Sequence, residues 1–407
     1  MQYVARRRIV ASVRFRLYPT KAQEALLLTH CAHARFVWNL GLEQRNMYRS
    51  TFGPTPNAAT QDKQLTEARS STWLGEGSST VQQQALRDLD RAFRNWWSNP
   101  GHFGRPTWRT KGIHESFRIV GSQARRYERL SRKRARVNVP KVGWVDWRWT
   151  RDPGDVKSYR IKRDAAGRWW IAFAAIPEPK PAPGNGVVVG VDRGVAHAFV
   201  LSDGEMIDVP KPPDGEKARL LRLQRKLARQ QKGSIRRERT KVQIARIRHR
   251  EFNRRRDVVE KLTTRLAADY DLIRIEDLRI GNMTRSAKGT AGAPGTNVAA
   301  KAGLNREILR SGWGQFARRL GDKAPSRVEK INPANTSRRC NACGHVAPEN
   351  RESQAVFLCV ACGHSANADV NAARNIAAGC AVTARGGEAD QGLPVKREPT
   401  HDLHQVG

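Results

Sequence analysis

Four cysteines in two nearly identical pairs restrict the fold of this chain more than any other local pattern. Cys340 and Cys343 lie in the string CNACGH, and Cys359 and Cys362 lie in CVACGH, 15 residues further on. Zinc prefers four such ligands at the corners of a tetrahedron, and each C-x-x-C turn places two thiolates on one ion. A glycine follows each pair, where the tight turn favours a positive φ. The spacing therefore predicts one structural Zn²⁺ bound by Cys340, Cys343, Cys359 and Cys362.

Two other interpretations of the cysteines are a disulfide pair and a redox-active C-x-x-C motif. The first residues, MQYVARRRIV, are basic and lack the apolar core of a signal peptide. No run approaches the ~18 apolar residues of a membrane span. We therefore expect a protein of a reducing cytosol with no membrane partner. In that reducing environment paired cysteines are typically metal ligands.

The charge balance points to a polyanionic partner. Lys and Arg total 74 against 38 Asp and Glu, which gives a net charge of +36. Such an excess favours nucleic acid, because each neutralised phosphate releases counterions. A ribosomal-type basic protein is the simpler alternative. Arginine outnumbers lysine, however, and its planar fork suits bidentate contacts with phosphate.

The N-terminal hundred residues predict one strand and two helices. Residues 9–17 alternate apolar and basic, as in a half-buried strand with arginine on its solvent face. Thr20 is a candidate N-cap for a helix over 21–49. Residues 50–80 are rich in Thr, Ser, Gly and Asn and predict a long, poorly ordered loop, and 80–98 predict a second helix. Core candidates are Leu26, Leu27, Phe36, Val37, Leu40, Leu42, Val81, Leu86, Leu89, Phe93 and Trp96.

Short alternating runs between residues 101 and 185 predict strands of a small barrel. Beyond a Pro/Gly-rich linker, 187–201 predict two buried strands. Residues 215–268 predict a helical hairpin that breaks at Lys232–Ser234, with a narrow apolar stripe of Leu220, Leu223, Leu227, Ile244 and Ile247. Within 216–257 there are 17 basic and 4 acidic residues. This run indicates a nucleic-acid surface, with an ordinary solvated helix face as the alternative.

Three carboxylates stand out by their position. Asp192 ends the apolar strand VVVGV, Glu276 ends the apolar strand LIRI, and Asp369 begins the helix VNAARNI. Carboxylates at the ends of buried strands suit a Mg²⁺ site at a sheet edge. Each acid alone is more often a turn former, and Asp369 is well placed as a helix cap. Asp277 should face the other side of its strand from Glu276.

Taken together, several strings resemble the TnpB family of RNA-guided, transposon-associated nucleases and their compact type V CRISPR relatives. GVDRGVAHAFVLSDG, IRIEDLRIGNM and the cysteine string ending in NADVNAARNI are similar to the three RuvC motifs, with the zinc ribbon before the third. VRFRLYPTKAQ and ARFVWNLGLEQR resemble the opening of the same family. The resemblance spans roughly residues 9–380, and the order of its motifs is specific.

The resemblance implies an α+β multidomain protein. Its parts are a wedge β-barrel (1–19 and 101–183), a helical recognition insertion (20–100), an RNase H-like RuvC domain with the arginine-rich hairpin (184–337 and 364–385), and a zinc ribbon (338–363). Residues 386–407 are expected to form a disordered tail.

The resemblance also implies an activity. It predicts a metal-dependent, RNA-guided DNA endonuclease in which Asp192, Glu276 and Asp369 hold catalytic Mg²⁺, as two ions. Its partners would be a guide RNA and a double-stranded target DNA read beside a short flanking motif. We expect a monomer or an asymmetric dimer.

One departure from the family pattern keeps two alternatives open. The third motif usually reads D-R-D, whereas here it is Asn367-Ala368-Asp369. We match the metal ligand to Asp369. If the ligand were the first position, the protein would be a catalytically inactive RNA-guided DNA-binding regulator. An RNase H-type transposase would share the three acids, but it would need no RNA and would usually carry a helix-turn-helix that this sequence does not clearly show.

Overall fold

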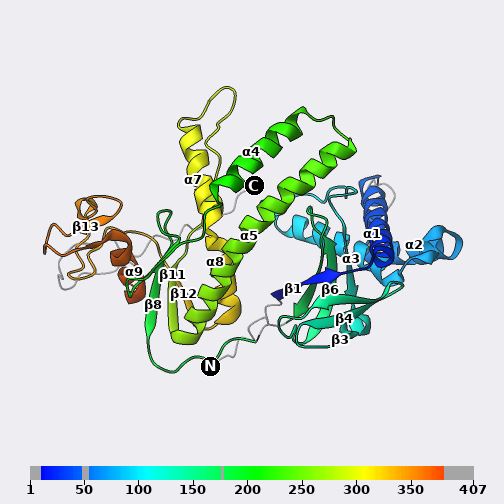
Figure 1. Ribbon diagram of the computed structural model, residues 1–407, viewed down its shortest axis with the longest axis horizontal. Helices are drawn as coiled ribbons and strands as arrows, with labels where there is room; N and C mark the ends of the chain where they lie inside the picture. The colour runs from blue at the N-terminus through cyan, green and yellow to red at the C-terminus, as the bar shows by residue number, and fades with distance from the viewer. Residues whose placement is uncertain (1–10, 48–54, 176–177, 380–407) are drawn as a thin grey trace, which may run out of the picture.

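The computed structural model describes residues 11–47, 55–175 and 178–379. It contains two large sheets, joined through the linker that precedes residue 188 and through the long helix α5 (Ile235–Asp269), as Figure 1 shows. Cys380, the predicted tail at 386–407 and the outer ends of the expected wedge and nuclease segments lie outside the described residues.

The first sheet is a seven-stranded antiparallel half-barrel in the order β2-β6-β7-β1-β5-β4-β3. Its residues alternate between faces, so that Phe15 and Leu17 are buried while Arg14 and Arg16 face away from the core. Since the two edge strands do not pair with each other, the expected barrel is open. The strands are β1 (Ala11–Tyr18), β2 (Ser116–Val120), β3 (Tyr127–Arg129), β4 (Arg134–Val139), β5 (Gly143–Arg148), β6 (Val156–Arg163) and β7 (Trp169–Ala175).

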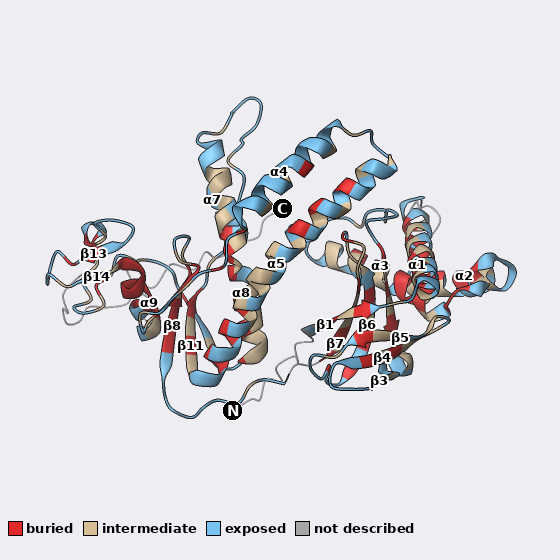
Figure 2. Ribbon diagram, viewed as in Figure 1, coloured by how far each residue is buried: buried red, intermediate tan, exposed pale blue. Residues whose placement is uncertain are grey.

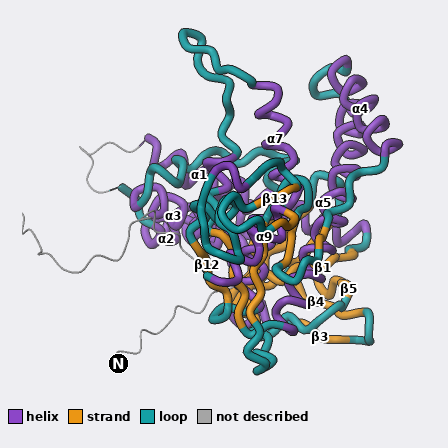
Figure 3. The backbone as a smooth tube through the Cα atoms, turned by 90° about the vertical axis from the view of Figure 1, so that its left-hand side faces the viewer, coloured by secondary structure: helices purple, strands orange, loops and turns teal. Residues whose placement is uncertain are grey.

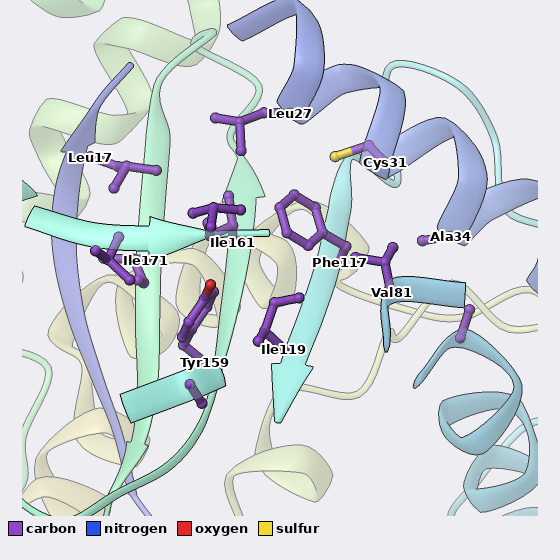
Figure 4. Packing of buried hydrophobic residues seen from close by; sticks show 14 of the residues in the cluster. Leu17, Leu27, Cys31, Ala34, Val81, Phe117, Ile119, Tyr159, Ile161 and Ile171 are labelled. Atoms are coloured by element: carbon purple, nitrogen blue, oxygen red, sulfur yellow. The ribbon is translucent and has the colours of Figure 1, made fainter. Parts of the chain in front are cut away.

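Helices α1 (Lys21–Met47) and α3 (Ser79–Ser98) pack together and cover part of this sheet. Figure 4 shows Leu27, Cys31 and Ala34 of α1 facing Phe117 and Ile161 of the sheet. Thr20 begins α1 as predicted: its hydroxyl accepts from the backbone N–H of Gln23 at 3.2 Å. The helix is therefore fixed at its first turn and along one buried stripe.

Two expectations for this region are wrong. Residues 58–71, expected in a loop, form α2 (Ala58–Ser71), because Asn57 caps its N-terminus and its own Leu65 is buried in the core. The core candidates Leu26, Phe36 and Leu40 are about 40% exposed. Only one stripe of the long helix α1 faces the core, and these three side chains lie outside it.

The second sheet is mixed and has the order β10-β9-β8-β11-β12. β8, β11 and β12 run parallel, whereas β9 and β10 are antiparallel to their neighbours. Helices α5 and α8 share its apolar core. The strands are β8 (Val188–Asp192), β9 (Phe199–Leu201), β10 (Met206–Ile207), β11 (Leu272–Glu276) and β12 (Val328–Ile331). The helices beside them are α6 (Ile280–Met283), α7 (Val298–Ser311), α8 (Trp313–Lys323) and α9 (Ala368–Ala378).

Helix α4 (Asp214–Arg229) folds back along α5 to form the predicted hairpin, and Figure 2 shows how much of its surface is exposed. Ser234 caps α5, so the break falls at the predicted residues. The predicted stripe holds the hairpin together: Leu223, Ile244 and Ile247 are buried, with Leu220 and Leu227 packed against them. In the two views of Figure 1 and Figure 3, α4 and α7 project from the same side of the molecule.

Among the described residues, no helix combines the length and apolar character that crossing a membrane requires.

Candidate functional site

Two of the three predicted carboxylates end neighbouring parallel strands. β8 ends at Asp192 and β11 ends at Glu276, and the pairing of Val191 with Ile275 sets both acids at the same edge of the sheet. The carboxyl ends of parallel strands are where α/β sheets commonly carry their ligand sites. The fold therefore brings together two acids that are 84 positions apart in the sequence.

Helix α9 carries the third carboxylate, Asp369, to the same edge. It packs against β8 at Gly190, where a Cβ atom would lie only 2.1 Å from the carbonyl oxygen of Ala373. Only glycine permits this approach. The Oδ2 atoms of Asp192 and Asp369 both lie within 4 Å of the point where a Cβ of Gly194 would stand, at 3.9 and 3.8 Å. The two carboxylates thus face a common space.

The three acids at this edge act on one another electrostatically. Burial, followed by the charges of Glu276 and Asp369, raises the pKa of Asp192 to about 7. Burial also raises the pKa of Glu276, although hydrogen bonding to Thr336 and the charge of Arg193 oppose the shift. Like charges crowded in a half-buried space create a site that a cation would stabilise.

Three residues that sequence reasoning missed hold the acids in place. Thr336 donates its hydroxyl to Oε1 of Glu276 at 2.7 Å, and the buried guanidinium of Arg193 donates to the backbone carbonyl of Glu276. Arg351 donates to Oδ1 of Asp369 at 3.3 Å. Arg193 directly follows Asp192, which was an available signal. Nothing in the sequence near Thr336 or Arg351 indicates a link to a distant carboxylate.

The helix cap differs from the expectation for Asp369. Asn367 is the N-cap of α9, and its Oδ1 accepts from the backbone N–H groups of Asp369 at 3.0 Å and Val370 at 3.2 Å. The carboxylate of Asp369 is therefore not used for capping. Asp277 is exposed and pairs with Lys330 at 3.0 Å, so its carboxylate is engaged by a lysine.

The four cysteines form the tightest cluster of possible metal ligands in the described residues, with their sulfur atoms all within 4.8 Å of one another. Sγ of Cys340 lies 3.8 Å from that of Cys362, and Sγ of Cys343 lies 3.6 Å from that of Cys359. Four sulfurs at about 2.3 Å from a tetrahedral zinc ion would be about 3.8 Å apart. A disulfide requires about 2.05 Å. The cluster therefore suggests zinc and excludes disulfide pairing.

The two knuckles have matching geometry. Gly344 and Gly363 have φ angles of +81° and +71°. Each donates its backbone N–H to the carbonyl oxygen of the first cysteine in its C-x-x-C turn, at 2.9 Å. Asn371 of α9 accepts from the backbone N–H of Asn341 and donates to the carbonyl of Arg339. These contacts attach the cysteine module, with its hairpin of β13 (Val356–Leu358) and β14 (Ser365–Asn367), to the helix that carries Asp369.

The carboxylates are more widely spaced than the cysteines. Within the described residues, no three carboxylate groups bring ligand atoms within the 4.8 Å that the sulfurs satisfy. They surround a space instead of touching. Their spacing therefore differs from that of a closed site in which three or more ligands hold one ion.

The α4–α5 hairpin is the strongest concentration of positive charge. Within residues 216–257 of the hairpin, five of the 17 basic residues come within 4 Å of a carboxylate, and the other twelve do not. The hairpin lies wholly within the described residues. A charged surface of this kind fits the phosphates of a nucleic acid.

Comparison with known proteins adds three family matches. A family described as "Probable transposase" matches residues 172–287, and "Cas12f1-like, TNB domain" matches residues 313–376. A third, "Helix-turn-helix domain", matches residues 10–53. Within that range, residues 11–47 form β1 and the one long helix α1, so the described part lacks the two helices of that motif.

Two relatives match almost the whole chain. "Putative RNA-guided DNA endonuclease InsQ" of Escherichia coli K12 is 37% identical over 95% of this chain and 96% of its own. "Putative RNA-guided DNA endonuclease" of Streptomyces pristinaespiralis is 30% identical over 92% and 90%. Among solved structures, "Cryo-EM structure of the Cas12f1-sgRNA-target DNA complex" covers 91% of this chain and 98% of that one, with 14% identity and a TM-score of 0.47.

Proposed function

Since the chain belongs to the TnpB-like family, we propose that it is an RNA-guided DNA endonuclease that cuts at Asp192, Glu276 and Asp369. The observation that carries this proposal is the convergence of the three carboxylates at one sheet edge, where burial and then the charges of Glu276 and Asp369 raise the pKa of Asp192 to about 7. A mixed sheet flanked by helices supports an RNase H-like RuvC core.

The donor set fits a hard divalent cation, because it consists of carboxylate oxygens around a common space. Mg²⁺, as two ions, would supply an activated water and stabilise the leaving oxygen. Arg351 engages Oδ1 of Asp369, which leaves Oδ2 for the shared space. Thr336 and Arg193 fix Glu276. Hydrolysis would break the P–O3′ bond and leave a 5′-phosphate and a 3′-hydroxyl.

The proposed partners follow from the charged and aromatic surfaces. The guide RNA would lie along the α4–α5 hairpin and the half-barrel. The target DNA would be read beside a short motif by the helices α1–α3 and neighbouring loops, where Trp97, Phe103 and Trp108 are exposed and available for stacking. Trp96 packs against the core and Arg45 is buried against Asp90, so these two side chains are not available to contact the DNA.

The inactive-regulator alternative rests on Asn367, where the family pattern has an acid. Its side chain caps α9 and is engaged by two backbone N–H groups. An acid at this position would do the same capping work. This geometry favours Asp369 as the ligand and thus an active nuclease.

The experiment that tests the proposal begins with purification from the native locus and sequencing of bound RNA. A Mg²⁺-dependent cleavage assay on a plasmid library with randomised flanks would follow. We expect one discrete RNA and cutting beside one short motif. Asp192→Ala, Glu276→Ala and Asp369→Ala should abolish cutting and retain RNA, whereas Asp277→Ala, which removes an adjacent exposed acid, should cut normally. Specific binding without cutting would support the regulator, and DNA processing without RNA would support the transposase.

A further inference from the structure

The outer face of the half-barrel carries a group of cations that lies against α5. Arg14 and Arg16 project from β1 on this face, and Trp170 of β7 pairs with Arg16 across the sheet. The guanidinium carbon of Arg14 lies 4.1 Å from the centroid of the Trp170 ring, and those of Arg16 and Arg168 lie 5.4 and 5.9 Å away. The ring of His249, from α5, lies 5.5 Å from the same tryptophan.

This group, which we call the Trp170 cluster (Arg14, Arg16, Arg168, Trp170 and His249), is short of negative charge. Asp164 is the carboxylate that acts on both β1 arginines and on His249. Its Oδ2 already accepts from Trp170 Nε1 at 2.8 Å and from Arg168 Nε at 3.2 Å. Burial, and then the neighbouring arginines, lower the pKa of His249. Three arginines thus share one carboxylate that is already engaged.

Several polar atoms of the cluster also lack hydrogen-bond partners. Nε and Nη2 of Arg14, Nη2 of Arg168 and Nε2 of His249 are buried without a hydrogen-bond partner in the described part of the chain. A buried donor without an acceptor destabilises a fold, and more so when it is charged. The β1 arginine Arg14 and the α5 arginine Arg256 also repel each other. The junction between half-barrel and long helix is therefore incomplete as it stands.

A pocket of about 600 Å³ lies beside this junction and reaches the cluster at His249. Asp164 and His249 line it together with Lys241 and Arg248 of α5, and Leu227 and Ile244 form an apolar part of its wall. Solvent-accessible cations at its rim and buried unpaired donors beside it are the chemistry of a phosphate site.

We infer that the Trp170 cluster is a binding site for backbone phosphates of a nucleic-acid strand, and that occupation of this site clamps the half-barrel to α5. Phosphate oxygens would accept from Arg14, Arg168 and His249 and offset the repulsion across the junction. The inference rests on the proposed function in one respect, which is that the phosphates belong to a nucleic acid. The phosphate chemistry itself follows from the unpaired donors.

The test uses the full chain with Arg14→Gln and His249→Gln. Arg118→Gln is the matched control, because Arg118 is a half-buried arginine of the same sheet that pairs with Asp88 at 3.4 Å and lies outside the Trp170 cluster. Thermal unfolding is measured as inorganic phosphate replaces chloride at constant ionic strength. Binding of single-stranded RNA and DNA of one sequence is then measured over a range of salt concentrations.

We expect phosphate to raise the melting temperature of wild type and Arg118→Gln, with the rise lost in the two cluster variants. Each cluster variant should bind the relevant strand roughly tenfold more weakly, with a log–log salt slope smaller by about 1. Whichever strand shows this loss, RNA or DNA, is the one that occupies the site. If Arg14→Gln does not fold, Arg14→Lys, which keeps the charge but loses the fork, replaces it.

Two results would overturn the inference: no stabilisation of wild type by phosphate beyond that of chloride, or an unchanged salt slope in both cluster variants. Asp192→Ala separates this outcome from failure of the nuclease proposal. It should lose cutting and keep both the phosphate response and the salt slope. A cutting-deficient wild type with a normal phosphate response would reject the nuclease proposal alone.

Discussion

Replacing Asp192 with asparagine is expected to stabilise the metal-free protein while it removes cutting. The pKa of Asp192 is about 7, against an ordinary value of 3.8, because of burial and the charges of Glu276 and Asp369. One pKa unit corresponds to about 1.4 kcal/mol. An ionised Asp192 therefore lowers the free energy of unfolding by at most about 4 kcal/mol well above pH 7, and solvent at this half-buried edge reduces that figure.

The pH dependence has a definite sign. The folded wild type holds a proton on Asp192 between about pH 4 and pH 7 that the unfolded chain has released. The contribution of this proton to the free energy of unfolding is therefore fully present below about pH 4 and is lost as the pH rises through 7. Asp192→Asn lacks this titration. The gain in stability over wild type should be small near pH 4 and largest near pH 8.

The assay is thermal and urea unfolding of both proteins in EDTA and in Mg²⁺ from about pH 5 to pH 8. Hydrogen exchange at β8 and β11 would assign the transition to this sheet. Mg²⁺ should stabilise wild type more than the variant at pH 8. Asp277→Asn, at an exposed acid paired with Lys330, is the control and should change little. A gain that is absent at pH 8, or equal at every pH, would refute the charge-crowding argument.

Four other predictions concern the supports of the site. Arg351→Gln removes a charge that lowers the pKa of Asp192, so the acid limb of the cleavage pH profile should move to higher pH; an unmoved limb would contradict this role. Elemental analysis should find about one zinc per chain, and Cys343→Ser should lose it and reduce cutting; folded wild type without zinc would reject the assignment. Gly190→Ala should destabilise by about 1–3 kcal/mol or more, measured by urea unfolding, because its Cβ meets α9 backbone. Asn367→Ala should destabilise by about 1 kcal/mol, whereas Asn367→Asp should retain both stability and cutting.

Patterns confined to short stretches were predictable from the sequence. The cysteine spacing predicts the sulfur cluster, and the five apolar residues of the stripe predict how α4 packs on α5. The strands that end at Asp192 and Glu276 are equally predictable from the sequence, because a buried strand is a contiguous apolar run. In each case the determining interactions lie within one element or between neighbours in the chain.

Other features required the tertiary structure. The alternation in residues 11–17 indicates an arginine face on β1 but not that α5 covers it and leaves Arg14 with unpaired donors. Composition suggested a loop over residues 58–71, where α2 forms. The helix forms nevertheless, because a few long-range contacts such as that of Leu65 outweigh the weak local helix propensity.

The candidate site divides in the same way. The sequence alone determined the cysteine ligand set and the identity of the three acids as candidates. Only the tertiary structure decided that Asp192 and Asp369, 177 positions apart, share one space, and that Arg351 reaches one of them. The physical reason is that secondary structure and ligand spacing are encoded in adjacent residues, whereas the pKa of a carboxylate depends on every charge and apolar atom that folding brings near it.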